Sequence, residues 1–111
     1  MTTLEQKLAT LPTSPGIYIF KDSAEEILYV GKAKLLRTRV RSYFQDGRQL
    51  EPAKEEMIPQ IKDLEVITTD TETEALVLEA NLIRKHQPPY NVLLRDDKFY
   101  LFIKITKDNP P

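Results

Sequence analysis

The order of apolar and polar residues along the chain predicts an alternation of helices and strands. A helix is expected over residues 3–11, where leucines recur at helical spacing. Residues 16–21 and 26–31 are rich in β-branched and aromatic side chains, which favours two strands. The short polar segment between these strands predicts an antiparallel hairpin.

The same patterns continue through the rest of the chain. Three further helices are expected at residues 33–44, 52–62 and 72–87, and further strands at residues 64–69 and 99–106. Pro59 predicts a kink or an early end of the second of these helices, because proline has no amide N–H. Since the hairpin must be antiparallel, we expect an α/β domain of the α+β type. Its small central antiparallel sheet, of about three strands, would be flanked by helices.

Composition narrows the class of protein. At 111 residues, with 41% hydrophobic and 30% charged residues, the chain is expected to form one soluble domain over residues 1–111. The absence of cysteine excludes disulfides and thiolate metal sites, and a single histidine excludes multi-histidine sites. We interpret that histidine, His86, as a helix-end residue favoured by the helix dipole. No apolar run is long enough for a membrane helix and no secretory signal is visible, so we expect a cytoplasmic protein without membrane contact.

Charge is unevenly distributed along the chain, although the formal net charge is only −1. Residues 31–48 hold six Lys or Arg residues against one Asp, a local charge of +5. Residues 49–81 hold two Lys against nine acidic residues, a local charge of −7. This segregation predicts a basic face that is suited to phosphate groups and an acidic face that is not.

Two tripeptides mark the predicted hairpin. They are Gly16-Ile17-Tyr18 and Tyr29-Val30-Gly31, and antiparallel pairing is expected to bring Tyr18 and Tyr29 close together. This pattern resembles the GIY-YIG nuclease family, with a departure at Val30 in the second tripeptide. Further matching blocks follow in the family's order, at residues 15–18, 31–33, 41–44, 74–79, 81–83 and 90–91.

The resemblance covers about residues 12–106 and is most similar to the UvrC branch of the family, which acts in bacterial nucleotide excision repair. It implies a metal-dependent endonuclease module that cuts one strand of a damaged DNA duplex on the 3′ side of the lesion. It also implies that the chain is a fragment of a longer protein with UvrB as a partner, and we expect the isolated domain to be a monomer. The alternatives are a non-catalytic DNA- or partner-binding module and another branch of the GIY-YIG endonucleases.

Phosphodiester cleavage needs charge neutralisation on the phosphate, and without Cys or clustered His a single divalent cation is the simplest source. Glu74 is the candidate ligand for one Mg²⁺ or Mn²⁺ ion, since Mg²⁺ often uses only one or two protein carboxylates. The resemblance points to the same residue. However, Glu74 also lies three residues after Thr71, which is the spacing of a helix capping box.

The other candidates surround this expected metal site. Tyr29 is the candidate general base or water-orienting group, with Tyr18 beside it and Tyr43 positioning a phosphate or Tyr18. Lys32 and Arg39 are expected to bind the scissile phosphate. General DNA-backbone contacts are expected from Lys34, Arg37 and Arg41, and supporting roles from Gly16, Gly31, Asn81 and Asn91.

Overall fold

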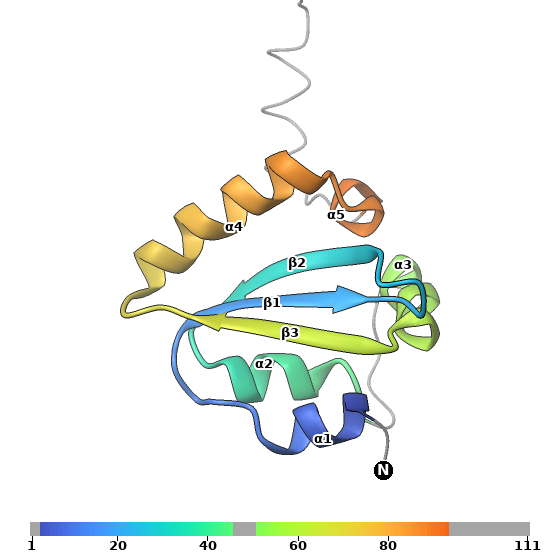
Figure 1. The fold of residues 1–111 in the computed structure, drawn as a ribbon, viewed down its shortest axis with the longest axis horizontal. Coiled ribbons are helices and arrows are strands. Elements are labelled where there is room, and N and C mark those ends of the chain that lie inside the picture. Colours follow the sequence, from blue (N-terminus) through green and yellow to red (C-terminus); the bar gives the residue numbers. More distant parts are fainter. Residues whose placement is uncertain (1–2, 46–50, 94–111) are drawn as a thin grey trace, which may run out of the picture.

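The structure is a computed structural model that describes residues 3–45 and 51–93. Its elements in chain order are α1 (Thr3–Ala9), β1 (Gly16–Lys21), β2 (Ile27–Ala33), α2 (Leu36–Ser42), α3 (Pro52–Met57), the 3₁₀ turn η1 (Ile58–Gln60), β3 (Asp63–Thr68), α4 (Glu72–His86) and α5 (Pro89–Leu93) (Figure 1). The strand expected at residues 99–106 lies outside the described residues. Within the described part of the chain, none of the helices has the length and apolar character needed to span a bilayer.

The three strands form one antiparallel sheet in the order β2-β1-β3. Tyr18 of β1 is directly opposite Gly31 of β2, and Phe20 is opposite Tyr29. The register between β1 and β2 shifts after Phe20, where β2 contains one extra residue. The expected α+β class with a small antiparallel sheet is therefore confirmed.

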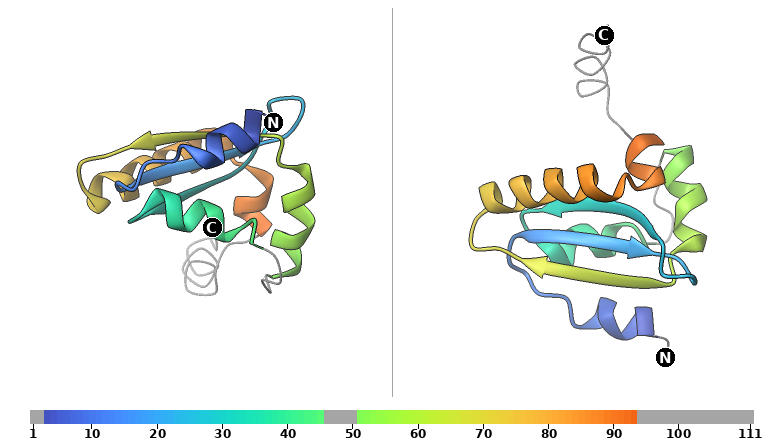
Figure 2. Two further views of the ribbon diagram at one scale, coloured as in Figure 1. Left: turned by 90° about the horizontal axis from the view of Figure 1, so that it is seen from below. Right: turned by 45° about the horizontal axis from the view of Figure 1, so that its top comes forward.

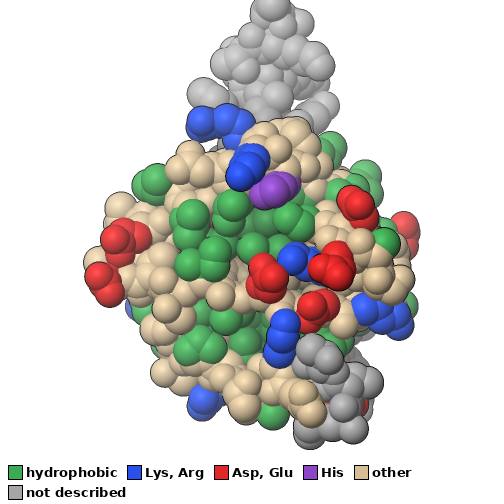
Figure 3. All heavy atoms as spheres, viewed as in Figure 1, with side chains coloured by type: hydrophobic (Ala, Val, Ile, Leu, Met, Phe, Trp, Pro, Cys, Tyr) green, Lys and Arg blue, Asp and Glu red, His purple; other side chains and the backbone are tan. Residues whose placement is uncertain are grey.

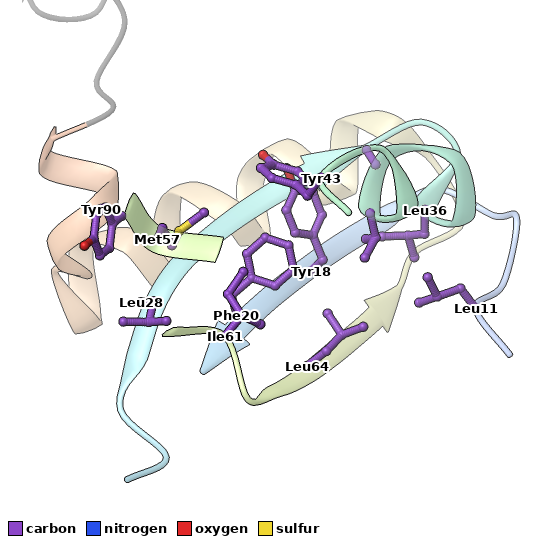
Figure 4. Close-up of a cluster of buried hydrophobic side chains, with 12 residues drawn as sticks. Leu11, Tyr18, Phe20, Leu28, Leu36, Tyr43, Met57, Ile61, Leu64 and Tyr90 are labelled. Atoms are coloured by element: carbon purple, nitrogen blue, oxygen red, sulfur yellow. The ribbon is translucent and has the colours of Figure 1, made fainter. Parts of the chain in front are cut away.

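Helices cover the two faces of the sheet unequally. Figure 1 shows α4 beside β2 and α1 beside β3, and Figure 2 shows α2 and α3 together on one side of the sheet. On that side the larger core gathers around Tyr18, Phe20 and Tyr43, with helix residues such as Leu36 and Met57 (Figure 4). The smaller core lies on the other face, where α4 packs against the alternate residues of β1 and β2, and consists of Ile17, Ile19, Val30 and Ala75.

Several boundaries differ from the sequence prediction for identifiable reasons. The helix expected from residue 33 begins at Leu36, because β2 continues through Ala33. The predicted interruption at Pro59 is present, since α3 ends at Met57 and a 3₁₀ turn carries the proline. The short helix α5 was not predicted: Pro89 was interpreted as a terminator, but it stands at the first position of a new helix, where its missing N–H costs nothing.

Candidate active site

Three tyrosines from three elements meet on one face of the sheet. The ring centroid of Tyr18 in β1 is 6.2 Å from that of Tyr29 in β2 and 5.8 Å from that of Tyr43 at the end of α2. The Tyr18 and Tyr43 hydroxyl oxygens are 2.8 Å apart and share a buried hydrogen bond. The expected approach of Tyr18 and Tyr29 is therefore confirmed, and Figure 4 shows Tyr18 and Tyr43 together in the core. We call Tyr18, Tyr29 and Tyr43 the tyrosine cluster.

The glycines of the two tripeptides allow close packing around the hairpin. A Cβ atom on Gly31 would collide with the ring of Tyr18, which lies across the Gly31 backbone. A Cβ atom on Gly16 would collide with the backbone carbonyl of Ile67 in β3. The glycines of both tripeptides are thus required by close packing, which is the supporting role expected of them.

Burial controls the ionisation of the tyrosine cluster. Burial, together with a smaller effect of the neighbouring Tyr29, raises the pKa of Tyr18 to about 12, against the hydrogen bond from Tyr43. Burial also raises the pKa values of Tyr29 and Tyr43. All three hydroxyls are therefore protonated at neutral pH, because burial in a medium of low polarity disfavours the charged phenolate.

Arg39 supplies a positive charge to this cluster from the side of α2. Its guanidinium carbon is 6.0 Å from the centre of the Tyr43 ring. The Coulombic effect of Tyr18 raises the pKa of Arg39 and is reinforced by a hydrogen bond between the two side chains. The four-residue spacing of Arg39 and Tyr43 places both on one face of α2, as expected.

A carboxylate that the sequence analysis missed lies at the edge of β2. Burial raises the pKa of Glu79, while the Lys32 ammonium and the Lys32 backbone N–H lower it. Glu79 also contributes to the raised pKa of Tyr29. Glu79 of α4, Lys32 and Tyr29 of β2 are therefore neighbours, and they place a carboxylate, an ammonium and a phenol at one edge of the sheet.

A sequence signal for Glu79 did exist. It lies in the matched block 74–79 and follows Ala75 by four residues, so it lies beside the buried face of α4. A half-buried glutamate on the inner flank of an amphipathic helix is unusual, because charged residues are rarely buried without a partner. The resemblance instead pointed to Glu74, the glutamate at the start of the helix.

Glu74 is engaged in the helix cap. Its carboxylate accepts hydrogen bonds from the backbone N–H of Asp70 at 2.9 Å and of Thr71 at 3.3 Å, while its own N–H donates to the Thr71 hydroxyl at 3.1 Å. The capping box is thus complete. Together with Asn81, Glu74 lines a groove of about 550 Å³ between α4 and the end of β3. Within residues 3–45 and 51–93, none of the hydrogen bonds of Glu74 reaches the tyrosine cluster, and its expected role as metal ligand stays a prediction.

The groove beside Glu74 has an apolar character. Its lining includes Ile67, Val77 and Leu78, and Ile67 and Val77 are exposed. Figure 3 shows hydrophobic side chains gathered on this face of the molecule. Asn81 therefore lies with Glu74 in this groove, and the supporting role expected of it stays a prediction.

The basic residues of α2 and its preceding loop divide into two groups. Lys32, Lys34 and Arg39 line one small cavity of about 360 Å³ at the start of α2. The guanidinium groups of Arg37 and Arg41 instead donate to backbone carbonyls at the end of α1 and just after it, those of Leu11 and of Leu8 and Ala9. Arg37 and Arg41, expected to contact DNA, thus attach α1 to α2.

Asn91 of α5 completes the outer edge of β2. Its side-chain oxygen accepts from the Val30 N–H, and its side-chain NH₂ donates to the Val30 carbonyl, both at 2.8 Å. Val30 lies between Tyr29 and Gly31, so these two hydrogen bonds hold the strand that carries the second tripeptide. The orienting role expected of Asn91 in the site stays a prediction.

The oxygen ligands at this edge of β2 suit one hard divalent cation. Among residues 3–45 and 51–93, no group of three or more His, Cys, Asp or Glu residues could hold a metal ion. A site with several histidine or carboxylate ligands, as zinc requires, is therefore not built from these residues. A single carboxylate with open space for water suits Mg²⁺ or Mn²⁺, and Glu79 is the carboxylate that lies beside the tyrosine cluster.

A family model described as the UvrC-like GIY-YIG domain matches residues 14–92. The chain belongs to the UvrC-like GIY-YIG domain family. The matched segment includes both tripeptides, the tyrosine cluster and Asn91, so the family domain coincides with the part of the chain that builds the site.

Curated relatives agree with this family. UvrABC system protein C of Caldicellulosiruptor saccharolyticus is 56% identical over 111 residues, covering 100% of this chain and 18% of that protein. The protein of the same name from Gloeobacter violaceus is 58% identical over 103 residues, covering 93% of this chain and 16% of the relative. The chain thus spans less than a fifth of the length of these curated relatives.

A solved structure of a single domain is similar to this chain over most of that domain's length. The GIY-YIG N-terminal endonuclease domain of UvrC from Thermotoga maritima, bound to its catalytic magnesium, has a TM-score of 0.68 and 39% identity. The match covers 78% of this chain and 93% of that chain. A point mutant of the same domain, also bound to the catalytic divalent cation, matches with a TM-score of 0.69 and 40% identity. The UvrC-like GIY-YIG fold is therefore present nearly whole.

Proposed function

We propose that this chain is the metal-dependent DNA endonuclease module of a UvrC-type protein and cuts one strand of a damaged duplex. The observation that carries the proposal is the meeting of the tyrosine cluster, Arg39, Lys32 and Glu79 along β2 and α2. A binding module without catalysis would have no use for a half-buried carboxylate beside basic residues, where it weakens attraction for phosphate. The solved relative, an endonuclease domain with a bound catalytic magnesium, supports the same function.

Glu79 is the residue that would hold the divalent cation, Mg²⁺ or Mn²⁺, in place of Glu74. Its raised pKa reflects burial that a bound cation would offset, because a positive charge stabilises the ionised carboxylate. When bound, the cation would supply Lewis-acid stabilisation of charge on the phosphate and lower the pKa of bound water. Glu74 keeps the role of capping α4.

The remaining residues bind and orient the substrate. Arg39 presents a planar guanidinium that can form two hydrogen bonds to the scissile phosphate, and Lys32 adds a point charge from the edge of β2. Tyr29 is half-buried, and its hydroxyl is protonated at neutral pH because burial raises its pKa. It therefore orients the attacking water by hydrogen bonding, and it accepts a proton only when nearby positive charge lowers that pKa. Tyr18 and Tyr43 fix the position of Arg39.

The proposal for the whole protein is based on the curated relatives, which are about six times as long as the chain. Within such a protein the domain would act in nucleotide excision repair with UvrB, cutting on the 3′ side of the lesion. We take residues 1–111 as one nuclease domain, monomeric when isolated, that works on DNA in the bacterial cytoplasm. Lys34 joins Lys32 and Arg39 in contacting the DNA backbone.

The test is a strand-nicking assay with the intact protein and UvrB on an end-labelled duplex that carries one lesion. We expect one 3′-side incision with Mg²⁺ or Mn²⁺ and none with EDTA. Glu79→Gln should abolish this incision without changing DNA affinity. DNA binding without incision in any divalent cation would instead identify a non-catalytic module, and incision without a divalent cation would exclude the metal-dependent mechanism.

A further inference from the structure

A second cation approaches the tyrosine cluster from a helix that the proposed site does not include. The Lys54 Nζ of α3 is 5.5 Å from the centre of the Tyr43 ring. Arg39 of α2 is 6.0 Å from the centre of that same ring. Tyr43 is thus contacted by positive charges from two helices that are separated in sequence, one on each side of residues 46–50.

Lys54 forms no ion pair within the part of the chain that the structure describes. The ion pairs formed within residues 3–45 and 51–93 are Lys7–Asp63 and Lys21–Glu65, and neither involves Lys54. Glu51, one turn before Lys54 on the same helix face, would be an ordinary partner, yet no ion pair forms with it in the described structure. Glu56 of the same helix accepts a hydrogen bond from Tyr90 instead. The Lys54 ammonium therefore lies against an aromatic ring and forms no ion pair with a carboxylate among residues 3–45 and 51–93.

We propose that Lys54 binds a backbone phosphate next to the scissile one, so that α3 forms a second wall of the DNA-binding surface. This inference rests on the proposed function, because it takes the phosphate at Arg39 as the site of cutting. A DNA strand carries a phosphate about every 3.4 Å of its axis, so cations that flank one ring can contact neighbouring phosphates. Tyr43 gives both cations one fixed point of contact, since its ring is buried and its hydroxyl is hydrogen-bonded to the Tyr18 hydroxyl.

A phosphate contact also explains why a lysine occurs at position 54. Lysine is a compact point charge on a flexible stem, which suits a backbone phosphate whose position varies with the lesion. A contact beside the scissile phosphate persists from the bound substrate to the transition state, so it contributes to binding more than to the chemical step.

The experiment compares Lys54→Ala and Lys54→Gln with the matched control Lys62→Ala in the intact protein. Lys62 is exposed, follows η1 and has no ion pair within the described residues. Binding of a fluorescein-labelled duplex is measured over a series of salt concentrations with EDTA present, and nicking kinetics are measured with Mg²⁺. Lys54→Gln keeps much of the alkyl stem, so it serves if the alanine variant does not fold.

We expect both Lys54 variants to reduce the slope of log affinity against log salt by about 0.9, the value for one lost phosphate contact. Their KM should rise while kcat stays near that of the wild type, and Lys62→Ala should change neither quantity. An unchanged salt slope with a lower melting temperature would overturn the proposal and leave Lys54 as packing for Tyr43. If the slope stays unchanged while wild-type protein still cuts DNA, only this inference fails; if wild-type protein neither binds nor cuts DNA, the proposed function fails with it.

Discussion

The ring of Tyr18 lies across the backbone of Gly31, its direct partner on the neighbouring strand. This contact explains why the two tripeptides of the hairpin occur together. The first supplies a large aromatic ring, and the second supplies the only residue type without a Cβ atom to obstruct it. Tyr18 can then reach the Tyr43 hydroxyl at 2.8 Å and position the end of α2.

Gly31→Ala should therefore damage both stability and cutting. The added methyl group has no space beside the Tyr18 ring, and such overpacking costs roughly 1–3 kcal/mol in the free energy of unfolding. Urea unfolding measures the stability, and a nicking assay measures activity on the folded fraction. Ala33→Gly on the same strand serves as a control for a backbone change away from the ring. Wild-type stability and activity of Gly31→Ala would contradict the close contact.

Glu79→Gln and Glu74→Gln should separate the metal ligand from the helix cap. Glu79→Gln removes the charge beside Lys32 and should reduce nicking by roughly 10²-fold or more, the scale for loss of one group that stabilises the transition state. Glu74→Gln keeps an amide that can still fill the capping box, so stability should change by less than about 0.5 kcal/mol and nicking should persist. A reversed outcome would return the metal to Glu74.

The tyrosine cluster should make stability fall at alkaline pH. The pKa values of Tyr18, Tyr29 and Tyr43 are raised in the folded protein, so their stabilisation is complete below the unfolded value of about 10. As pH rises beyond that value, the unfolded chain loses protons that the folded chain keeps, and the free energy of unfolding decreases. Three such groups give a slope of about 4 kcal/mol per pH unit at most.

Urea unfolding at a series of pH values from neutral to strongly alkaline checks this expectation. Stability should vary little through tyrosine ionisation below about pH 9 and then fall steeply. Tyr18→Phe should reduce the steepness of the fall by about a third, because it removes one of the three groups. A stability that is flat through the alkaline range would show that the hydroxyls are accessible to water.

Arg39→Ala and Arg41→Ala should have opposite consequences. Arg39 lies on the tyrosine cluster, so its loss should lower the single-turnover cutting rate by roughly 10²–10³ with little change in stability. Arg41 binds backbone carbonyls of Leu8 and Ala9, so its loss should lower stability by about 1 kcal/mol and leave the cutting rate of the folded protein unchanged. Equal loss of cutting in both variants would mean that the helix acts only through its total charge.

The sequence predicted the parts of the site that depend on local patterns. Strand alternation placed Tyr18 and Phe20 on one face, and helical spacing placed Arg39 beside Tyr43. The predictions for Arg37 and Arg41 missed their packing role because their partners are backbone carbonyls of α1 and of the residues just after it, more than twenty residues away in sequence. No periodic pattern records which carbonyls a distant helix leaves free.

The choice between Glu74 and Glu79 shows the same limit. Capping-box spacing and the family resemblance both pointed to Glu74, and local spacing alone could not separate the two roles. In the folded chain Glu79 lies beside Lys32, while Glu74 stays in the cap at the helix end. The position of α4 depends on the packing of Ala75 and its neighbours on Ile17, Ile19 and Val30, which is a tertiary relationship.

The two hydrogen bonds between Asn91 and Val30 also protect the edge of β2 from pairing with a strand of another chain. β2 is an outer strand, and an outer strand with free N–H and C=O groups is a template on which another chain can add a strand. Asn91 forms hydrogen bonds with both the N–H and the C=O of Val30, so the middle of β2 is blocked from pairing with another strand. Asn91→Ala, or a chain that stops before α5, would leave the N–H and C=O groups of Val30 free. Such proteins would self-associate through β2 as their concentration increases, and the nuclease module would become prone to aggregation.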